Sequence, residues 1–189
     1  ASPLWFEAMY QGRPFIAEGN LIRKPFQHYS MEVVDGKEVF TLRFLDGQVL
    51  VVHEDQTIRF GALDLAESKK KTADWTALGS FVVTKTSPRY LIVRDVVRTR
   101  VSTEEHAPFL TRESLRMRLG YTLIEKATYG TNLVNIMRRQ NKIRVRPVNA
   151  DKDKVTRANG TIVPALEMRQ LFFPAPEDAP WYIEFEKEL

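Results

Sequence analysis

Residues 30–53 read Ser-Met-Glu-Val-Val-Asp-Gly-Lys-Glu-Val-Phe-Thr-Leu-Arg-Phe-Leu-Asp-Gly-Gln-Val-Leu-Val-Val-His. Two Asp-Gly pairs, at 35–36 and 46–47, separate three runs that are rich in β-branched and aromatic residues. An Asp-Gly pair supplies the positive φ that a two-residue hairpin turn requires. The stretch therefore predicts a three-stranded antiparallel meander, which we place within residues 28–60.

The middle run of this meander has the alternation of a half-buried strand. Phe40 and Leu42 point to one face, whereas Thr41 and Arg43 point to the other. The third run, residues 49–52, is apolar on both faces, so we expect it inside the sheet. Later β-rich runs predict further strands at 80–86, 90–101, 142–146, 168–173 and 181–185. Residues 151–159 predict a polar loop that ends in an Asn-Gly turn.

A second kind of pattern covers residues 111–142, where apolar residues recur at helical spacing. Thr111 is a suitable N-cap for a first helix, Tyr129-Gly130 is a suitable end, and Asn132 can cap a second helix. We therefore predict an α+β fold: a mostly antiparallel sheet or barrel, with a helical pair at about 111–142 packed against it.

The 189 residues are enough for one sizeable domain, and we treat residues 1–189 as a single domain. It divides into an N-terminal arm, a β-rich part, a basic helical part, and late strands with an acidic tail. These parts cover residues 1–27, 28–105, 106–146 and 147–189. Aromatic residues near both ends are candidates for contacts with other subunits: Trp5, Phe6, Tyr10, Trp181 and Tyr182.

Basic residues concentrate in residues 111–146. This segment holds nine of the chain's 28 lysines and arginines and two of its 24 acidic residues. Such a segment can neutralise phosphates and bind nucleic acid, or it can face an acidic protein surface. A solvated or self-paired surface explains the same charges without a partner. The candidate contact residues are Arg116, Arg118, Arg138, Arg139, Lys142, Arg144 and Arg146.

Several functional classes lack their sequence signals. There is no cysteine, and the three histidines are scattered, so we expect no metal site and no cofactor. Glycine motifs for nucleotide or dinucleotide binding and the hydrolase nucleophile motif are also missing. Neither a signal peptide nor an apolar run long enough to cross a membrane is present. We therefore expect a cytoplasmic or particle-associated protein with no membrane partner.

These observations favour a non-enzymatic structural or assembly component of a larger complex, such as a virion-like or nucleoprotein particle. Its partners would be protein subunits, of its own or another kind, and nucleic acid would be a further partner. The aromatic arm and the opposite charges of the tail and the basic segment support this interpretation. The alternative is a free nucleic-acid-binding module or regulator whose arginines and lysines contact phosphate.

Two weaker motifs complete the set of alternatives. Residues 119–122, Leu-Gly-Tyr-Thr, are similar to the turn of a helix-turn-helix. Glu67-Ser68-Lys69, downstream of Asp46 and Asp55, resembles part of a metal-dependent nuclease motif. In such enzymes the acid and the lysine lie on an apolar strand, whereas here they lie in a lysine run, which favours a solvated surface.

Overall fold

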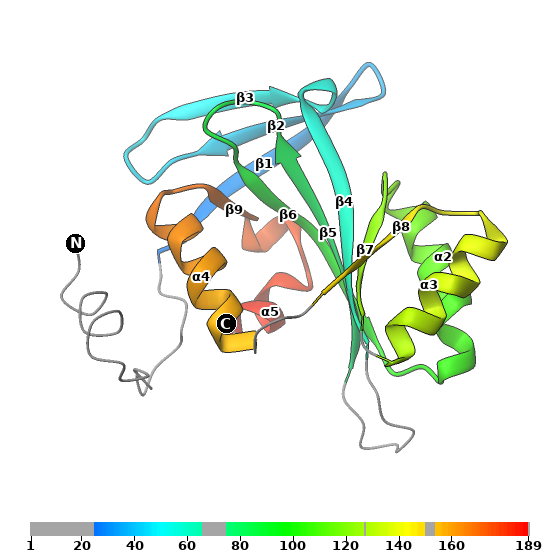
Figure 1. The fold of residues 1–189 in the computed structure, drawn as a ribbon. Coiled ribbons are helices and arrows are strands. Elements are labelled where there is room, and N and C mark those ends of the chain that lie inside the picture. The colour runs from blue at the N-terminus through cyan, green and yellow to red at the C-terminus, as the bar shows by residue number, and fades with distance from the viewer. Residues whose placement is uncertain (1–24, 66–74, 127, 150–153, 189) are drawn as a thin grey trace, which may run out of the picture.

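The computed structural model describes residues 25–65, 75–126, 128–149 and 154–188. These residues form one nine-stranded sheet with four α-helices on its faces (Figure 1). The strands are β1 Gln27–Val34, β2 Lys37–Arg43, β3 Val49–His53, β4 Thr57–Asp64, β5 Thr76–Thr84, β6 Leu91–Thr99, β7 Thr122–Glu125, β8 Val145–Val148 and β9 Leu171–Pro174. The α-helices are α2 His106–Arg116, α3 Thr128–Gln140, α4 Lys154–Glu167 and α5 Tyr182–Glu188.

The strand order is β3-β2-β1-β9-β6-β5-β4-β7-β8. Two antiparallel meanders, β1-β2-β3 and β4-β5-β6, supply most of the sheet, and β9 joins them by pairing in parallel with both β1 and β6. On the other side of β4, strands β7 and β8 add in parallel. The predicted α+β class with a mostly antiparallel sheet is therefore confirmed, but the sheet is open and is not a barrel.

The meander predicted at residues 28–60 is present as β1, β2 and β3. Asp35 and Gly36 both have positive φ in its first turn, and Gly47 has φ +86° in its second. Phe40 and Leu42 of β2 are fully buried, as the alternation predicts. The third strand differs from the prediction because β3 is an edge strand with one neighbour, which leaves Val49 and Val51 exposed.

The predicted helical pair is corrected in its boundaries. Thr111 lies inside α2 rather than at its N-cap, and Gly130 lies inside α3 rather than at a helix end. Between these helices residues 122–125 form β7 rather than continuing a helix. The β-structure is favoured here because β7 is flanked by β4 and β8, which satisfy its backbone groups.

Two later predictions are also wrong. Residues 154–159, predicted as loop, belong to α4, and residues 182–185, predicted as strand, belong to α5. Tyr182 and Phe185 pack together on the core at helical spacing, so burial follows a period near 3.6 rather than 2. None of the helices in the described ranges has the length and apolarity needed to cross a membrane.

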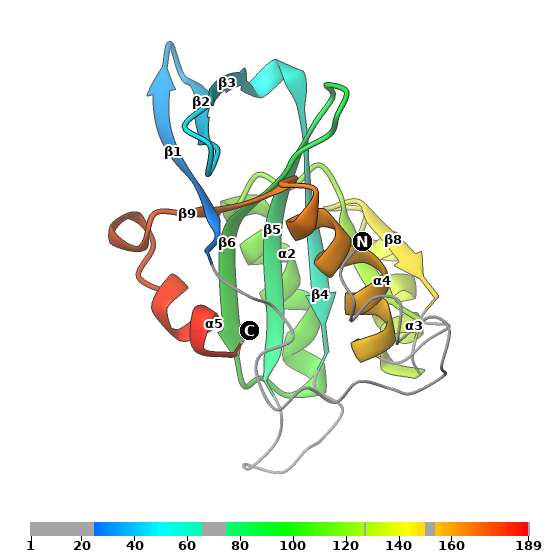
Figure 2. The same ribbon diagram turned by 90° about the vertical axis from the view of Figure 1, so that its left-hand side faces the viewer.

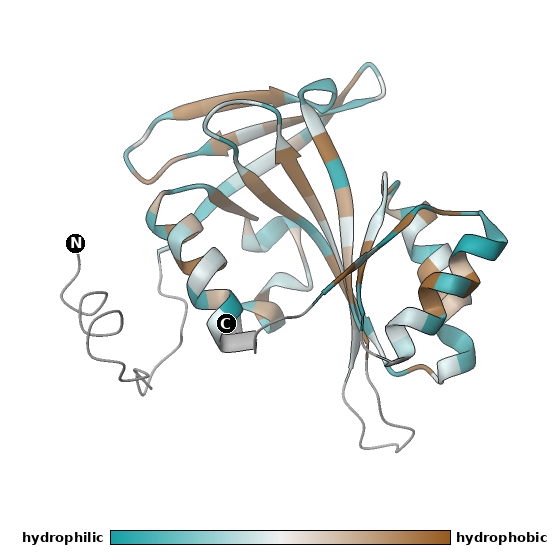
Figure 3. Cartoon of the chain, in the orientation of Figure 1, coloured by the Kyte–Doolittle hydropathy of each residue, from teal (hydrophilic) through white to brown (hydrophobic). Residues whose placement is uncertain are grey.

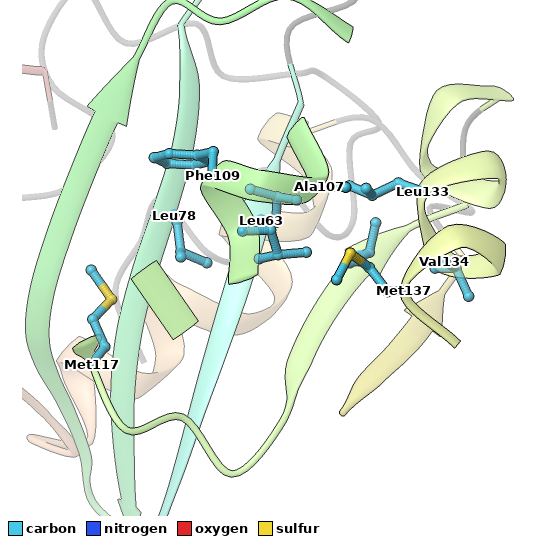
Figure 4. Close-up of a cluster of buried hydrophobic side chains, with 10 residues drawn as sticks. Leu63, Leu78, Ala107, Phe109, Met117, Leu133, Val134 and Met137 are labelled. Atoms are coloured by element: carbon cyan, nitrogen blue, oxygen red, sulfur yellow. The ribbon is translucent and has the colours of Figure 1, made fainter. Parts of the chain in front are cut away.

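One face of the sheet is covered by α2 and α3 (Figures 1 and 2). Leu63 of β4, Leu78 of β5 and Ile124 of β7 point into this core. Side chains of α2 and α3 meet them there, including Phe109, Leu133 and Met137 (Figure 4). Strands β5 and β6 are largely coloured as hydrophobic in Figure 3, which agrees with their place in the middle of the sheet.

The opposite face of the sheet is covered by α4 and α5, which lie in front of the strands in Figure 2. Phe173 of β9 and Tyr182 of α5 are buried there with Val93 of β6. The β1-β2-β3 meander forms a separate layer at the other end of the sheet, at the top of Figure 1. It packs Phe40 and Leu42 in one cluster with Val82 and Ile92.

A buried carboxylate joins this meander to the rest of the sheet. Glu38 of β2 is 1% exposed and accepts hydrogen bonds from Arg59, Arg94 and Arg118. The Arg94 Nη2 and Arg118 Nη2 atoms each lie 2.8 Å from Glu38 Oε1. These four residues, the Glu38 cluster, come from β2, β4, β6 and the segment after α2, so one carboxylate fixes how four parts of the chain meet.

The pKa of the Glu38 carboxyl reflects two opposing effects. Burial raises it, but the hydrogen bonds and charges of Arg94 and Arg59 outweigh burial and leave the pKa below its ordinary value. The charged form is therefore more favourable in the folded chain than in the unfolded chain. Its stabilisation is complete above the unfolded pKa, near 4.5, and is lost as the pH falls through the lower folded pKa.

A glycine sets the position of the β7–α3 connection. Gly130 is buried, and a Cβ at this position would lie 1.9 Å from the Glu125 carbonyl oxygen. No side chain fits at that distance, so the close approach of α3 to the end of β7 depends on glycine. Gly160 of α4 is the contrasting case, because a Cβ there meets nothing within 4 Å.

We predict that Glu38→Gln lowers the free energy of unfolding by about 3–5 kcal/mol at pH 7, because three arginines lose their shared counter-charge. Urea unfolding of wild type and variant, repeated from pH 7 down to about pH 3, measures this difference. It should shrink as Glu38 becomes protonated in the wild type. Asp46→Asn is the control, because its partner Arg169 is half-exposed, and should cost less than about 1 kcal/mol. Equal effects of the two variants would contradict the structural role of the cluster.

We predict opposite effects for two glycine substitutions in helices. Gly130→Ala should lower the free energy of unfolding by about 1–3 kcal/mol, the usual cost of overpacking, because the backbone near Glu125 must move. Gly160→Ala should raise it by about 0.5–1 kcal/mol, since alanine favours the helix and meets no neighbour. Thermal unfolding of both variants tests the pair. A neutral Gly130→Ala would show that α3 does not approach β7 as described.

Candidate active site

Two carboxylates lie at the same edge of the sheet, at the ends of neighbouring parallel strands. Leu63 of β4 pairs with Ile124 of β7, and the next residues along these strands are Asp64 and Glu125. Since parallel strands in register end at one edge, the two acids occupy adjacent positions there, about one strand spacing of 4.8 Å apart in backbone terms. We refer to Asp64 and Glu125 as the acid pair.

The acid pair faces away from the α2–α3 core. Leu63 and Ile124 point into that core, and successive residues of a strand point to opposite faces. Asp64 is exposed and Glu125 is half-exposed on the face that α4 and α5 partly cover. Polar groups at the carboxyl edge of parallel strands are the usual location of ligand sites in open α/β sheets.

An arginine of α4 contacts Glu125, one member of the acid pair. The Arg157 Nη1 atom donates to Glu125 Oε2 at 3.3 Å, and both side chains are 38% exposed. The Arg157 Nε atom is buried and has no hydrogen-bond partner within the described part of the chain. The guanidinium therefore lies beside Glu125, and one of its donors has no acceptor among the described residues.

A row of aromatic rings lies on the same face, further from the carboxyl edge. Phe60 of β4 stacks between Phe81 of β5 and Tyr121, with centroid distances of 5.5 and 5.8 Å. The guanidinium of Arg146, on edge strand β8, lies 4.3 Å from the centre of the Tyr121 ring. Arg146 pairs across with Leu123, two residues before Glu125, so a fixed cation lies close to the acid pair on the β8 side.

The structure separates the seven predicted contact residues into three groups. Arg116 and Arg118 bind acids of the same chain: Arg116 contacts Glu113 and Asp95, and Arg118 belongs to the Glu38 cluster. Arg138, Arg139 and Lys142 are exposed at and after the end of α3, on the other side of the sheet. Arg146 is exposed on β8, and Arg144 is exposed directly before this strand. The basic segment is thus not one continuous surface.

The predicted subunit contacts remain predictions. Trp5, Phe6 and Tyr10 lie outside the described residues. Tyr182 is fully buried in the chain's own core, and Trp181 is half-buried against Phe185.

The nuclease-like motif of the sequence does not coincide with the acid pair. Glu67-Ser68-Lys69 lies outside the described residues. Asp46 is in the β2–β3 turn, bound to Arg169, and Asp55 is exposed before the start of β4. The seven residue steps of β4 between Thr57 and Asp64 span about 23 Å, so Asp55 and Asp64 lie at opposite ends of this strand.

Sequence reasoning missed both members of the acid pair. Each is the carboxylate that ends a short apolar run, Gly61-Ala-Leu-Asp64 and Thr122-Leu-Ile-Glu125. This signal is present in the sequence, but it gains meaning only when both runs are recognised as strands. The helical spacing predicts a helix over residues 122–125. Glu125 is therefore not predicted to lie at the end of a strand.

Comparison with known proteins identifies the family. The family model of the terminase RNaseH-like domain matches residues 61–189, which include the acid pair and all four described helices. No curated protein gives a significant match.

Two solved structures of the large terminase nuclease from the thermophilic phage G20c, one with bound zinc and one with bound magnesium, are also similar. Each is 12% identical to this chain with a TM-score of 0.48, and each alignment covers 79% of this chain. The alignments cover 75% and 68% of the two phage chains, respectively.

The family overturns the main functional expectation. A match to an RNaseH-like domain points to a nuclease, so the prediction of a non-enzymatic structural or assembly component is wrong. The physical cause of the error is that the acids of the site are brought together by strand pairing and not by spacing in the sequence. The chain belongs to the terminase RNaseH-like domain family.

Proposed function

We propose that this chain hydrolyses phosphodiester bonds of nucleic acid with a divalent cation bound by Asp64 and Glu125. The observation that carries the proposal is the in-register parallel pairing of β4 with β7, which places two carboxylates side by side in a chain of this family. The geometry supports this reaction better than simple nucleic-acid binding, because binding to phosphate alone would be weakened by two neighbouring carboxylates.

The donor chemistry of the acid pair fits magnesium or manganese. These cations prefer carboxylate oxygens, and magnesium is commonly held by one or two carboxylates together with waters and substrate phosphates. No group of three histidine or acidic side chains suited to a metal occurs among the described residues. Asp151 and Asp153 follow β8 in the sequence and lie outside those residues.

Each described residue has a distinct role in this proposal. A bound divalent cation supplies Lewis-acid activation of the phosphate and of a water molecule. Asp64 and Glu125 are the residues that would hold this cation at the sheet edge. Arg157, whose side chain is 38% exposed beside Glu125, can donate from its guanidinium to a phosphate oxygen of the substrate.

Of the predicted contact residues, we assign Arg144 and Arg146 to the nucleic acid. Both are exposed on the β8 side of the acid pair. Arg146 lies on the same face of the sheet as the acid pair. An arginine there can neutralise a phosphate next to the cleaved one. Arg138, Arg139 and Lys142 lie on the α3 side and have no such position relative to the acid pair.

We predict that Asp64→Asn and Glu125→Gln each reduce manganese-dependent cleavage of DNA at least about a hundredfold, because an amide is a poor ligand for a hard cation. Circular dichroism and thermal unfolding should show intact folds. Asp46→Asn and Asp55→Asn are the matched controls and should retain cleavage, since neither acid lies at the carboxyl edge of β4 and β7. Full activity of both acid-pair variants would contradict the proposed function.

We predict that Arg157→Gln tightens manganese binding about fivefold, as expected for the removal of an unfavourable interaction of about 1 kcal/mol between half-exposed groups. The guanidinium lies 3.3 Å from Glu125 and competes with the cation for the same carboxylate. Isothermal titration calorimetry without nucleic acid measures this effect independently of cleavage.

Arg169→Gln is the control for this titration, because Arg169 binds Asp46 and not the acid pair. It should leave manganese affinity unchanged. Weaker manganese binding by Arg157→Gln would show instead that Arg157 orients Glu125 for the cation.

A further inference from the structure

An exposed tryptophan packs beside two arginines near the carboxyl edge of β4. Trp75 directly precedes β5 and is 43% exposed. The guanidinium carbons of Arg98 and Arg100 lie 4.9 and 4.4 Å from the centre of its ring. We refer to these three residues as the Trp75 cluster.

The strand register places this cluster on the same face as the acid pair. Ala77 of β5 pairs on one side with Asp64 of β4 and on the other side with Arg98 of β6. Paired residues share a face, so Arg98, Ala77 and Asp64 form one row across three strands. Arg98 also donates to Glu184 of α5 at 2.7 Å, and α5 covers this face of the sheet. Trp75 lies two residues before Ala77 and therefore also points to this face.

The charge of this surface is complementary to nucleic acid. Glu184 offsets one of the two arginine charges of the cluster, and Arg100 is exposed at the end of β6. A tryptophan ring stacks on nucleic-acid bases of any sequence, and arginines beside it can neutralise the adjoining phosphates. The exposed ring and the net positive charge thus fit an unpaired base with its backbone.

We propose that the Trp75 cluster is a binding subsite for an unpaired nucleotide of the strand whose phosphate lies at the acid pair. This inference rests on the proposed function. It adds the place on the β5–β6 side at which the protein holds the nucleic-acid strand. Trp75 stacks on the base, and Arg100 contacts a phosphate. Arg144 and Arg146 hold the strand on the opposite, β8, side.

The dimensions of the sheet are consistent with this path. From β4 to β6 is two strand spacings, about 10 Å. At the helical rise of about 3.4 Å per nucleotide, about three nucleotides span that distance, and a more extended unpaired strand spans it with fewer. The nucleic-acid strand would cross the carboxyl edge of the sheet perpendicular to β4. The acid pair would then lie between the Trp75 cluster and Arg146.

The test measures binding of single-stranded oligonucleotides of about twelve nucleotides by fluorescence anisotropy in EDTA, where no cleavage occurs. Trp75→Ala should bind oligothymidylate about 5- to 150-fold more weakly than wild type, the range expected for loss of one stacked base. Trp75→Phe should lose less, because it keeps an aromatic face.

An abasic strand of the same length separates stacking from other effects. It offers phosphates but no bases, so wild type and Trp75→Ala should bind it equally. Wild type should also bind it more weakly than oligothymidylate, a comparison that needs no variant and holds even if Trp75→Ala does not fold. Equal binding of both strands by the wild type would overturn the stacking subsite.

Charge-matched variants test the arginine. Arg100→Ala should reduce the slope of log affinity against log salt by about 0.7, the value for one phosphate contact on a single strand. Arg139→Ala, on the α3 side, removes the same charge and should leave the slope unchanged. Equal slopes for Arg100→Ala and wild type would contradict the phosphate contact.

Manganese-dependent cleavage by the same preparations distinguishes the two proposals. Wild-type cleavage with unaltered binding by Trp75→Ala would overturn the subsite and leave the nuclease function in place. Weakened binding by Trp75→Ala in a protein that cleaves nothing would support the subsite and contradict the nuclease function.

Discussion

The parallel pairing of β4 with β7 is the constraint on which the site depends. β4 already pairs with β5 in an antiparallel meander, and its other edge accepts β7 only after the chain has returned through β5, β6 and α2. A parallel neighbour requires such a crossover, because the chain must travel back to the amino end of the sheet. The same crossover supplies α2 as the cover of one face. One pairing therefore determines both the α2–α3 core and the meeting of Asp64 with Glu125.

The two faces of the sheet have different electrostatic roles. On the α2 side, the positive charges of Arg59, Arg94 and Arg118 surround one buried carboxylate, Glu38. Such a cluster is costly to desolvate, and its benefit comes from complete mutual pairing. It fixes the position of the β1-β2-β3 meander relative to the family domain that begins at residue 61.

On the α4–α5 side, charges remain accessible to solvent. Two carboxylates lie at the edge of the sheet, with Arg157 beside Glu125, Arg146 toward β8, and the Trp75 cluster toward β6. Cations on both sides of an acidic centre suit a phosphate chain that passes over a bound metal ion. In the proposed function, the cations at the flanks would attract a polyanion and the acidic centre would hold a divalent cation.

The sequence by itself determined the local structure of the first meander. Asp-Gly turns and alternation were sufficient for the meander at 28–60, because a hairpin forms between neighbours in the chain. The charge excess of residues 111–146 was also visible. The tertiary structure decided which arginines remain accessible, since Arg118 reaches Glu38 across 80 residues, whereas Arg146 stays exposed at the sheet edge. It also decided the acid pair: Asp64 and Glu125 are far apart in the chain, and parallel register, a non-local property, makes them neighbours.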